Sequence, residues 1–378
     1  MNQGKVKQNI AMLGHKRIPS REGGVEIVVE ELSTRMAALG HRVTCYNRSG
    51  HHVSGEEFDA DVGEIYRGVR LITVPTLDKK GLAAVTSSFF ASVRSAFSKA
   101  DVVHIHAEGP ALFCWIPKLF GKKTVVTVHG LNWQCEKWKN SIGSRVILMG
   151  ERTAVRFADE IIVLNRATET YFLETYGRKT TYIPNGVARP ERLPLEKAAE
   201  KFSLASDAYI LFLGRLVPEK GVHYLIESFR NVQTDKKLVI AGGSSDSSEY
   251  ISQLKEMAAG DSRVVFTGFV QGRLLEELYS NAYIYVLPSD TEGMPLSLLE
   301  AMSYGNCCLI SDIPGSTEVA EDKAVVFQKS NVEDLAKHLQ ALCDDSHKVN
   351  NIKNVAQDFI CAKYNWDDVV NKTLELYQ

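Results

Sequence analysis

Short apolar runs alternate with amphipathic stretches along the 378-residue chain. In the first half, the runs have the length and composition of buried strands, at 9–13, 42–46, 69–74, 102–105, 124–128 and 160–164. Helical spacing of apolar residues follows between them, over 25–39, 82–98, 109–120, 141–157 and 167–176. Strands that alternate with helices are typical of a parallel sheet covered on both faces, so the first half is predicted to be an α/β domain.

The same alternation restarts after residue 207. Further strand patterns lie at 210–213, 237–241, 264–266, 284–287 and 308–310, again with helical patterns between them. Residues 188–207 are rich in charge and proline, which indicates a linker and an entry helix. A chain of this length is expected to form two domains. We therefore predict two α/β domains, over 1–187 and 188–363.

Two carboxylates flank the predicted start of a helix that follows the strand at 284–287. Glu292 lies in the loop, Glu300 lies on the helix, and Gly293 and Pro295 mark the turn between strand and helix. A helix N-terminus has free N–H groups and the positive end of a dipole, so it favours anions. Carboxylates accept hydrogen bonds from sugar and ribose hydroxyls. This stretch therefore offers what a sugar nucleotide needs, whereas a lone glutamate would indicate only a solvated surface.

Two cations follow another strand of the second half. The strand at 210–213 leads through Gly214 to Arg215 and Lys220, on the loop before the next helix. Guanidinium and ammonium groups donate charge-assisted hydrogen bonds to phosphate oxygens, so this pair could neutralise a diphosphate. Taken alone, the two residues fit a solvated basic loop equally well.

In the first half, a long loop with Gly23 and Gly24 joins the strand at 9–13 to the helix at 25–39. A strand, a glycine loop and a helix form a phosphate-binding arrangement, although most glycine pairs are only turns. The loop lacks the G-x-G-x-x-G spacing, so a Rossmann dehydrogenase is not supported. His129 follows the strand at 124–128, at the end of the strand where parallel sheets bind ligands, but a histidine there is more often structural.

The order and spacing of these residues resemble those of a known family. Glu292 and Glu300, within E-G-M-P-L-S-L-L-E-A-M, resemble the Glu-x7-Glu signature of retaining GT-B glycosyltransferases of the family 4 type. The run G-R-L-V-P-E-K-G, with Arg215 and Lys220, and the run T-V-H-G-L, with His129, are similar to further motifs of that family. The loop I-P-S-R-E-G-G-V-E resembles the first-domain loop of bacterial cell-surface polysaccharide transferases, including rhamnosyl-type ones.

The resemblance implies a GT-B fold, in which two Rossmann-like domains face each other across an interdomain cleft. The first domain would bind the acceptor and the second the nucleotide sugar, while the closing helix, within 364–378, would pack back on the first domain. The resemblance assigns donor binding to Gly23, Gly24, Gly214, Arg215, Lys220, Glu292, Gly293, Met294, Pro295, Leu296 and Glu300. It assigns catalysis to His129, Arg215, Lys220 and Glu292. It implies no metal and no cofactor, because two protein cations would take the place of a metal and the nucleotide sugar is a co-substrate.

We expect from this resemblance a retaining, metal-independent hexosyl-type transferase. Its partners would be a nucleotide-diphosphate sugar and a saccharide or lipid-linked saccharide of bacterial cell-surface polysaccharide biosynthesis, and no nucleic acid. Three alternatives stay open. They are a glycosyltransferase for a small-metabolite acceptor, a GT-B sugar-nucleotide epimerase and a non-catalytic sugar-binding protein.

Charge is distributed unevenly between the two halves. Residues 1–187 contain 25 Lys+Arg and 18 Asp+Glu, a net charge of +7, whereas residues 188–378 contain 19 and 28, a net charge of −9. A basic first half could face an anionic membrane or a phosphate-bearing acceptor, or it could reflect neutral drift of surface charge. Aromatic segments at 89–97 and 112–120, the second followed by Lys122 and Lys123, could contact a membrane surface, although core packing is the commoner cause.

Several features bear on location and on metals. Seven cysteines are scattered without a C-x-x-C pair, which is typical of reduced thiols in the cytosol. The N-terminus lacks the apolar segment of a signal peptide, and no apolar run approaches the roughly 18 residues of a membrane span. We expect a cytoplasmic protein, at the inner face of the membrane if the basic half contacts lipid. Asp59 and Asp61 spell D-x-D, the metal-diphosphate signature of a different transferase fold, but they follow no strand and are discounted.

Overall fold

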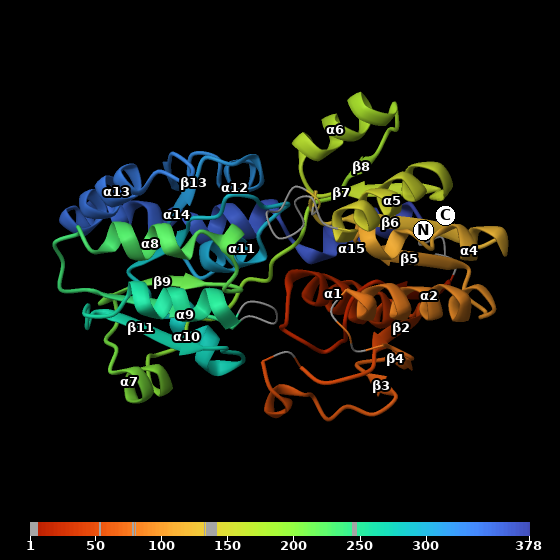
Figure 1. The fold of residues 1–378 in the computed structure, drawn as a ribbon, viewed down its shortest axis with the longest axis horizontal. Coiled ribbons are helices and arrows are strands. Elements are labelled where there is room, and N and C mark those ends of the chain that lie inside the picture. The colour runs from red at the N-terminus through yellow and green to blue at the C-terminus, as the bar shows by residue number, and fades with distance from the viewer. Residues whose placement is uncertain are drawn as a thin grey trace, which may run out of the picture. The chain divides into compact units, whose positions relative to one another are not determined.

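A computed structural model describes residues 7–52, 54–77, 79, 81–131, 133, 142–243 and 248–378. The chain divides into two compact units (Figure 1). Unit 1 contains Met1–Asn185 and Trp366–Gln378, and unit 2 contains Gly186–Asn365. The sequence interpretation predicted domain boundaries after residues 187 and 363.

Unit 1 is built on an eight-stranded sheet with the order β3-β4-β2-β1-β5-β6-β7-β8. Its strands are β1 (Asn9–Leu13), β2 (Arg42–Arg48), β3 (Ile65–Tyr66), β4 (Val69–Val74), β5 (Val102–His106), β6 (Lys123–Val128), β7 (Glu160–Val163) and β8 (Thr181–Tyr182). All neighbours are parallel except the edge pair of β3 and β4. The central strands β1, β5, β6 and β7 are rich in buried aliphatic residues, which is why their apolar runs predicted them closely.

The antiparallel edge pair was not expected from the sequence. Arg67 and Gly68 form the two-residue turn between β3 and β4, and their φ angles are 46° and 82°. Positive φ at both central residues matches the right-handed twist of a hairpin, and glycine adopts it without strain. The edge of the otherwise parallel sheet is therefore closed by a short hairpin strand.

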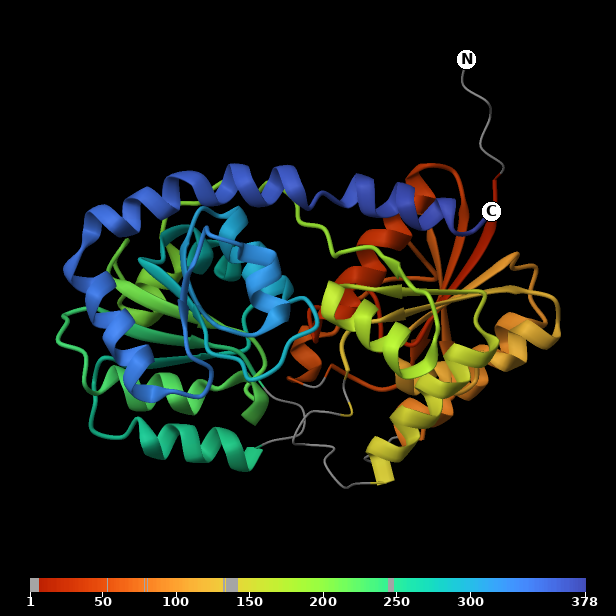
Figure 2. The ribbon, with the colours of Figure 1, turned by 90° about the horizontal axis from the view of Figure 1, so that it is seen from above.

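Helices cover the sheet of unit 1 and include the C-terminal one. They are α1 (Gly24–Ala38), α2 (Leu82–Ala96), α3 (Glu108–Ala111), α4 (Trp115–Leu119), α5 (Ile142–Phe157), α6 (Arg166–Tyr176) and α15 (Trp366–Glu375), with a 3₁₀ turn at Glu56–Phe58. α15 lies beside α1, where Arg35 Nη1 donates to Asp367 Oδ1 at 2.8 Å (Figure 2). The buried ring of Tyr377 just after it meets His104 of β5, with 2.7 Å between the hydroxyl and Nδ1. The last residues of the chain thus complete the core of unit 1.

The helix predicted over 109–120 is in fact two short helices, α3 and α4. Pro117 explains the break, because a proline has no N–H to donate and its ring clashes with the carbonyl four residues earlier, that of Phe113. In the structure α4 begins at Trp115, which places Pro117 in a first turn where no N–H is needed.

Unit 2 is a six-stranded, all-parallel sheet with the order β11-β10-β9-β12-β13-β14. Its strands are β9 (Tyr209–Leu213), β10 (Lys237–Ala241), β11 (Val264–Gly268), β12 (Ile284–Leu287), β13 (Cys307–Ser311) and β14 (Val325–Phe327). Its helices are α7 (Lys197–Phe202), α8 (Val222–Phe229), α9 (Ser248–Met257), α10 (Arg273–Asn281), α11 (Leu296–Ser303), α12 (Pro314–Ala320), α13 (Val332–Asp344) and α14 (Ser346–Lys363), with a 3₁₀ turn at Pro218–Lys220. Both units are therefore Rossmann-like.

Candidate active site

Each sheet has one pair of neighbouring strands at which the strand order reverses. The chain continues from one of them toward one edge of the sheet, and from the other toward the opposite edge. We call this pair the switch point. In unit 2 the pair is β9 and β12, because β10 and β11 lie on one side of β9 and β12 returns to the other. Ligands of open parallel sheets bind at the carboxyl ends of such a pair. Gly214 and Arg215 directly follow β9, and the loop with Glu292 follows β12. The two motifs predicted from sequence therefore lie at the switch point of unit 2.

Lys220 and Glu292 form an ion pair, although 72 residues separate them. Their side chains are 14% and 10% exposed, so the pair lies largely out of water. Ser289 adds a hydrogen bond from Oγ to Glu292 Oε1 at 2.7 Å. Glu292 is therefore held by two donors, and the cation predicted to meet a diphosphate is paired with the carboxylate predicted to contact the sugar.

Two glycines allow the backbones around this pair to approach closely. Gly221, next to Lys220, has a φ of +67°, and a Cβ there would lie 2.0 Å from the carbonyl oxygen of Pro288. A Cβ on Gly315 of α12 would lie 2.2 Å from the carbonyl oxygen of Glu292. Any larger residue would push these segments apart. The geometry of the Lys220–Glu292 pair therefore depends on small residues on two neighbouring segments.

The rest of the predicted acidic motif leads into α11. Pro295 is the residue just before this helix rather than in its first turn, and Met294 and Leu296 are buried beside it. Glu300 lies half-buried on α11, and the hydroxyl of Tyr279 lies 3.3 Å from its Oε2. Tyr279 is itself fixed by a stacked contact with Tyr304.

Arg215 differs from Lys220. It is exposed, and no hydrogen bond or ion pair of its side chain appears among the described residues. A guanidinium on a loop at the end of β9 keeps its donors available for an incoming anion. Unit 2 thus offers one engaged cation and one exposed cation at the same switch point.

In unit 1 the corresponding strands are β1 and β5. His15 comes two residues after β1, and His106 is the last residue of β5. The loop after β1 passes directly over β5, since a Cβ on Gly14 would lie 2.2 Å from the carbonyl oxygen of His106. Gly14 also has a φ of +102°, which disfavours any other residue. Two buried histidines therefore occupy the switch point of unit 1.

His129, which follows β6, joins these histidines. Its Nε2 lies 3.1 Å from Nδ1 of His106, and the ring of His106 lies 4.2 Å from that of His104. Burial lowers the pKa of His129 and of His15 to about 4, and that of His104 to about 3. Burial also holds the pKa of His106 well below its usual value, with the neighbouring imidazoles adding to the effect. All four rings are therefore neutral near pH 7, able to donate and accept hydrogen bonds without charge.

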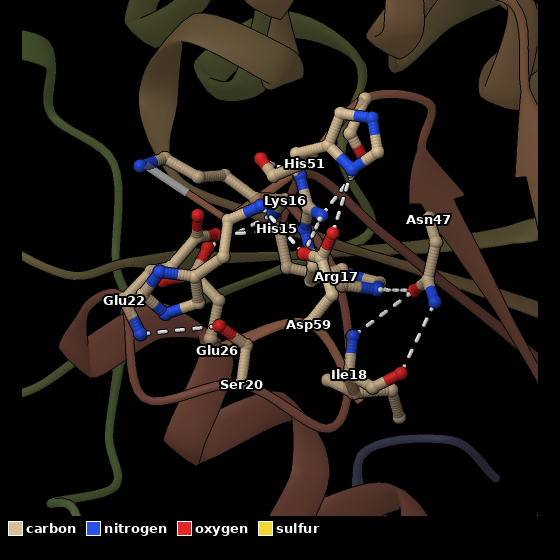
Figure 3. Close-up of polar contacts among 12 residues, drawn as sticks. His15, Lys16, Arg17, Ile18, Ser20, Glu22, Glu26, Asn47, His51 and Asp59 are labelled. Carbon is tan, nitrogen blue, oxygen red and sulfur yellow. Dashed lines mark hydrogen bonds and ion pairs between the residues drawn. The ribbon is translucent and has the colours of Figure 1, made fainter. Parts of the chain in front are cut away.

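A carboxylate lies beside this cluster. Glu26, in the first turn of α1, is buried, and its Oε1 accepts a hydrogen bond from the amide of Lys16 at 2.9 Å (Figure 3). Burial alone would raise its pKa, but the charge of Lys16 and the backbone hydrogen bonds outweigh burial, so the pKa of Glu26 is lowered. Gly23 precedes α1 and Gly24 opens it, so the two predicted glycines lie at the N-terminus of this helix next to Glu26.

Sequence reasoning missed several of these residues. Ser289 and Tyr279 gave no signal, because each is defined only by the carboxylate that it contacts. His15 and Glu26 did stand inside the glycine loop and first helix that were singled out, yet burial could not be read from the sequence. No group of three or more His, Cys, Asp or Glu side chains that could hold a metal ion occurs in the described ranges. Nor do the described helices include one that is long and apolar enough to cross a membrane.

Comparisons with known proteins agree with this geometry. The family model "Glycosyltransferase Family 4" matches residues 22–189, and the model "Glycosyl transferases group 1" matches residues 196–359. The alpha-maltose-1-phosphate synthase of Mycolicibacterium smegmatis is 24% identical over 400 residues, which cover 98% of each chain. The O-antigen chain mannosyltransferase B of Escherichia coli is 28% identical over 203 residues, about half of either chain (52% and 51%).

Among solved structures, the Anabaena protein HepE in complex with UDP-glucose superimposes with a TM-score of 0.78 at 17% identity, covering 97% of this chain and 99% of that one. Two Rossmann-like sheets in this order, with these neighbours, define the GT-B fold. The two family models together account for nearly the whole chain. The chain therefore belongs to the family 4, group 1 glycosyltransferases, enzymes that take a sugar from a nucleotide-sugar donor.

Proposed function

We propose that this enzyme is a retaining, metal-independent hexosyltransferase whose acceptor is a saccharide or lipid-linked saccharide. The Lys220–Glu292 ion pair at the switch point of unit 2 is the observation that carries the proposal. It brings together, from distant parts of the chain, one group that suits a diphosphate and one that suits a sugar hydroxyl. A solvated basic loop would not bury its lysine against a glutamate.

The reaction breaks the bond between the sugar C1 and the diphosphate and forms a bond from C1 to an acceptor oxygen on the same face. The acceptor proton passes to the leaving diphosphate, so no side chain has to act as a nucleophile. Negative charge grows on the diphosphate as it leaves. Arg215 and Lys220 stabilise that charge from fixed positions, which is the most effective form of electrostatic catalysis. Glu292 orients the sugar and Glu300 accepts from the ribose.

His129 is assigned a positioning role rather than that of a general base. Its burial lowers its pKa to about 4, so it is a weak base near neutral pH. A neutral imidazole held against His106 can still accept from or donate to a sugar hydroxyl. Gly23 and Gly24, at the start of α1, would allow close approach of the donor.

The first experiment is a thermal shift of the pure protein against UDP, GDP, ADP and dTDP. A selective rise with one nucleotide that is lost in Lys220→Ala and weakened in Glu300→Gln would support the assigned donor site. UDP is a natural first choice because a relative of similar fold binds UDP-glucose. No rise with any of the four at millimolar concentration would contradict the donor site.

The open alternatives differ in their products. Slow hydrolysis of the donor without acceptor would exclude a non-catalytic binding protein, and a donor sugar recovered with unchanged configuration at every other carbon would exclude an epimerase. The similarity to the O-antigen chain mannosyltransferase B supports a polymeric acceptor. The similarity to the alpha-maltose-1-phosphate synthase supports a small acceptor. Mass analysis of products from an acceptor screen separates the two.

A surface on α2 and α4 supports a membrane-borne acceptor. Every exposed Phe and Trp among the described residues lies here, a set that we call the aromatic face: Phe89, Phe90, Phe97, Trp115 and Phe120. Phe97 is 72% exposed, and its ring packs against Phe120 with 4.6 Å between centroids, so the two helices form one surface. Neither 82–100 nor 109–123 contains an acidic residue, whereas they contain Arg94 and Lys99, and Lys118, Lys122 and Lys123.

Such a surface suits the interface of an anionic bilayer, where aromatic rings and basic residues both bind favourably. We expect the protein to sediment with vesicles that contain phosphatidylglycerol and to stay in solution with pure phosphatidylcholine. The double variant Phe97→Ser/Phe120→Ser should lose this binding, whereas Met149→Ser, at an exposed apolar residue of α5, should keep it. Equal sedimentation of all three proteins would contradict a role for the aromatic face.

A further inference from the structure

Unit 1 contains a cavity of about 770 Å³ that the assigned donor and catalytic residues do not line. Its walls are the loop after β1 at Arg17, the end of β2 at Arg48, the segment from Asp59 to Glu64, the strand β4 and residue Arg94 of α2. The cavity therefore lies beside the carboxyl ends of β1 and β2, at the edge of the sheet that the β3–β4 hairpin closes. Carboxyl ends of parallel strands are where such sheets bind ligands.

The charge of the lining is strongly unbalanced. Four arginines face two carboxylates, those of Asp59 and Glu64. One arginine and one carboxylate neutralise each other, because Arg17 Nη1 lies 3.2 Å from Asp59 Oδ1 (Figure 3). Among the lining residues, Arg48, Arg70 and Arg94 then remain against the carboxylate of Glu64. Three guanidinium groups around one cavity repel one another unless an anion joins them.

Asp59 cannot serve as a metal ligand in this arrangement, despite its D-x-D sequence. Its Oδ2 lies 2.7 Å from Nδ1 of His51, and its Oδ1 accepts from the amide of His52 at 2.6 Å as well as from Arg17. Arg17 also donates to the carbonyl oxygens of Gly50 and His51, at 2.8 and 2.5 Å. The carboxylate therefore organises the loop that forms one wall of the cavity, which leaves the cations as the groups that could meet a ligand.

Arg48 is the most informative of these cations. It ends β2, where its amide donates to the carbonyl of Lys16, and the residue is half-buried. Its Nε has no hydrogen-bond partner within the described part of the chain. Burial lowers the pKa of Arg48, while the charges of the Glu26 and Glu22 carboxylates act in the opposite direction. A buried guanidinium N–H without a hydrogen-bond partner is costly, and a bound anion that accepts from it would remove that cost.

Arg94 connects the cavity to the aromatic face. On α2, Phe90, Arg94 and Phe97 follow one another at spacings of four and three residues, which places them on one side of the helix. Arg94 is exposed and also lines the cavity. A molecule held at the aromatic face could therefore extend an anionic group into the cavity without crossing the rest of unit 1.

We propose that this cavity binds an anionic group of the acceptor, a phosphate or a carboxylate, through Arg48 and Arg94. The proposal rests on the proposed transferase function and specifies its acceptor as acidic. Both anions present two oxygens in a plane that a guanidinium fork matches, so the cavity suits them equally. The donor diphosphate is assigned to Arg215 and Lys220 of unit 2, which leaves this cavity for the second substrate.

The test uses inorganic pyrophosphate and glucuronate as separate probes, measured by titration calorimetry. The protein is titrated alone and again after saturation with the nucleotide that stabilises it most, so that the donor site is filled in one series. We compare wild type with Arg48→Gln, Arg94→Gln and the control Arg42→Gln, which changes an exposed arginine at the opposite end of β2.

We expect at least one probe to bind wild type and Arg42→Gln alike, and each cavity variant to weaken that binding about tenfold. A loss confined to pyrophosphate would identify a phosphate-bearing acceptor, and a loss confined to glucuronate an acidic sugar. The proposal is wrong if neither probe binds, if both cavity variants bind like wild type, or if Arg42→Gln loses as much affinity. Arg94→Gln keeps the test decisive should Arg48→Gln fail to fold, because Arg94 is exposed.

Donor hydrolysis without acceptor, measured on the same preparations, separates this proposal from the proposed function. Hydrolysis by wild type together with absent probe binding would overturn only the acidic-acceptor site. Probe binding that depends on Arg48 and Arg94, without any donor hydrolysis, would support an anion site while contradicting the transferase assignment on which its role as an acceptor site depends.

Discussion

The two units share one architecture but differ in the chemistry at their switch points. In unit 2 the carboxyl ends of β9 and β12 lead to charged groups, the Lys220–Glu292 pair and the exposed Arg215. In unit 1 the carboxyl ends of β1 and β5 lead to buried imidazoles, His15 and His106. A switch point that carries cations suits a diphosphate, whereas one with neutral imidazoles suits hydroxyl groups that need orientation. The same fold therefore supports two different tasks through the residues at the strand ends.

The largest effect that this contrast predicts is acid destabilisation of unit 1. Four histidines with folded-state pKa values below the unfolded value of about 6.5 stabilise the fold fully above that pH. Below pH 6.5 these histidines become protonated in the unfolded chain, whereas in the folded chain they stay neutral down to about pH 4 or lower. Each histidine should then remove about 1.4 kcal/mol of stability per pH unit, so unit 1 should lose several kcal/mol between pH 7 and 5.

Tryptophan fluorescence can follow this loss in unit 1 alone, because all four tryptophans of the chain fall within that unit. Urea unfolding at pH 7, 6 and 5 measures how the free energy of unfolding changes with pH. His104→Gln should reduce this change by about 1.4 kcal/mol per pH unit, because it removes one of the four titrating rings. A urea midpoint that stays constant from pH 7 to 5 would show that these rings already take up protons in the folded state. The claim that the imidazoles at the switch point of unit 1 are neutral would then be wrong.

The next largest effect concerns the charged switch point. Lys220→Met should lower kcat for donor turnover about 10² to 10³-fold, as expected when one preorganised donor to a developing anion is lost. It also leaves the largely buried Glu292 with the hydrogen bond from Ser289 Oγ. Lys255→Met, on the exposed side of α9, is the matched control and should behave like wild type. Turnover within threefold of wild type in Lys220→Met would contradict the role of this cation.

These effects could be anticipated from sequence to different degrees. The strands at Asn9–Leu13 and Ile284–Leu287 were predicted to the residue, because a buried parallel strand is a continuous apolar run bounded by polar turns. The loop and helix that contain Glu292 and Glu300 could be predicted because a local pattern and a family resemblance coincide there. Local patterns of this kind specify elements and the order of motifs along the chain.

Contacts between residues that are far apart in the chain leave no such local pattern in the sequence. The approach of Lys220 to Glu292 depends on Gly221 and Gly315 lying against distant carbonyl oxygens, and nothing in the neighbouring sequence indicates either contact. The neutrality of His129 and His15 likewise depends on burial by several elements at once. The arginine-lined cavity joins β1, β2, β4 and α2, so it exists only after the sheet has formed.

A smaller effect tests whether those backbone contacts matter. Gly315→Ala places a methyl group 2.2 Å from the carbonyl oxygen of Glu292, so the loop must move away from α12. We expect the KM for the donor to rise about tenfold, with a loss of about 1 to 3 kcal/mol in stability. Gly109→Ala is the control, because a Cβ there meets nothing within 4 Å. A donor KM equal to that of the control would mean that the loop geometry tolerates the shift.

The smallest expected effect is that of removing divalent metal ions. If Arg215 and Lys220 together neutralise the leaving diphosphate, no metal charge is needed there, and EDTA should change donor turnover by less than about twofold. The measurement is donor hydrolysis by protein dialysed against EDTA, with Mg²⁺ or Mn²⁺ added back to a parallel sample. Activity that EDTA abolishes and Mg²⁺ or Mn²⁺ restores would contradict neutralisation by the two cations. It would also narrow the contrast between the units, because the charge at the unit 2 switch point would then depend on a bound ion rather than on the protein's own side chains.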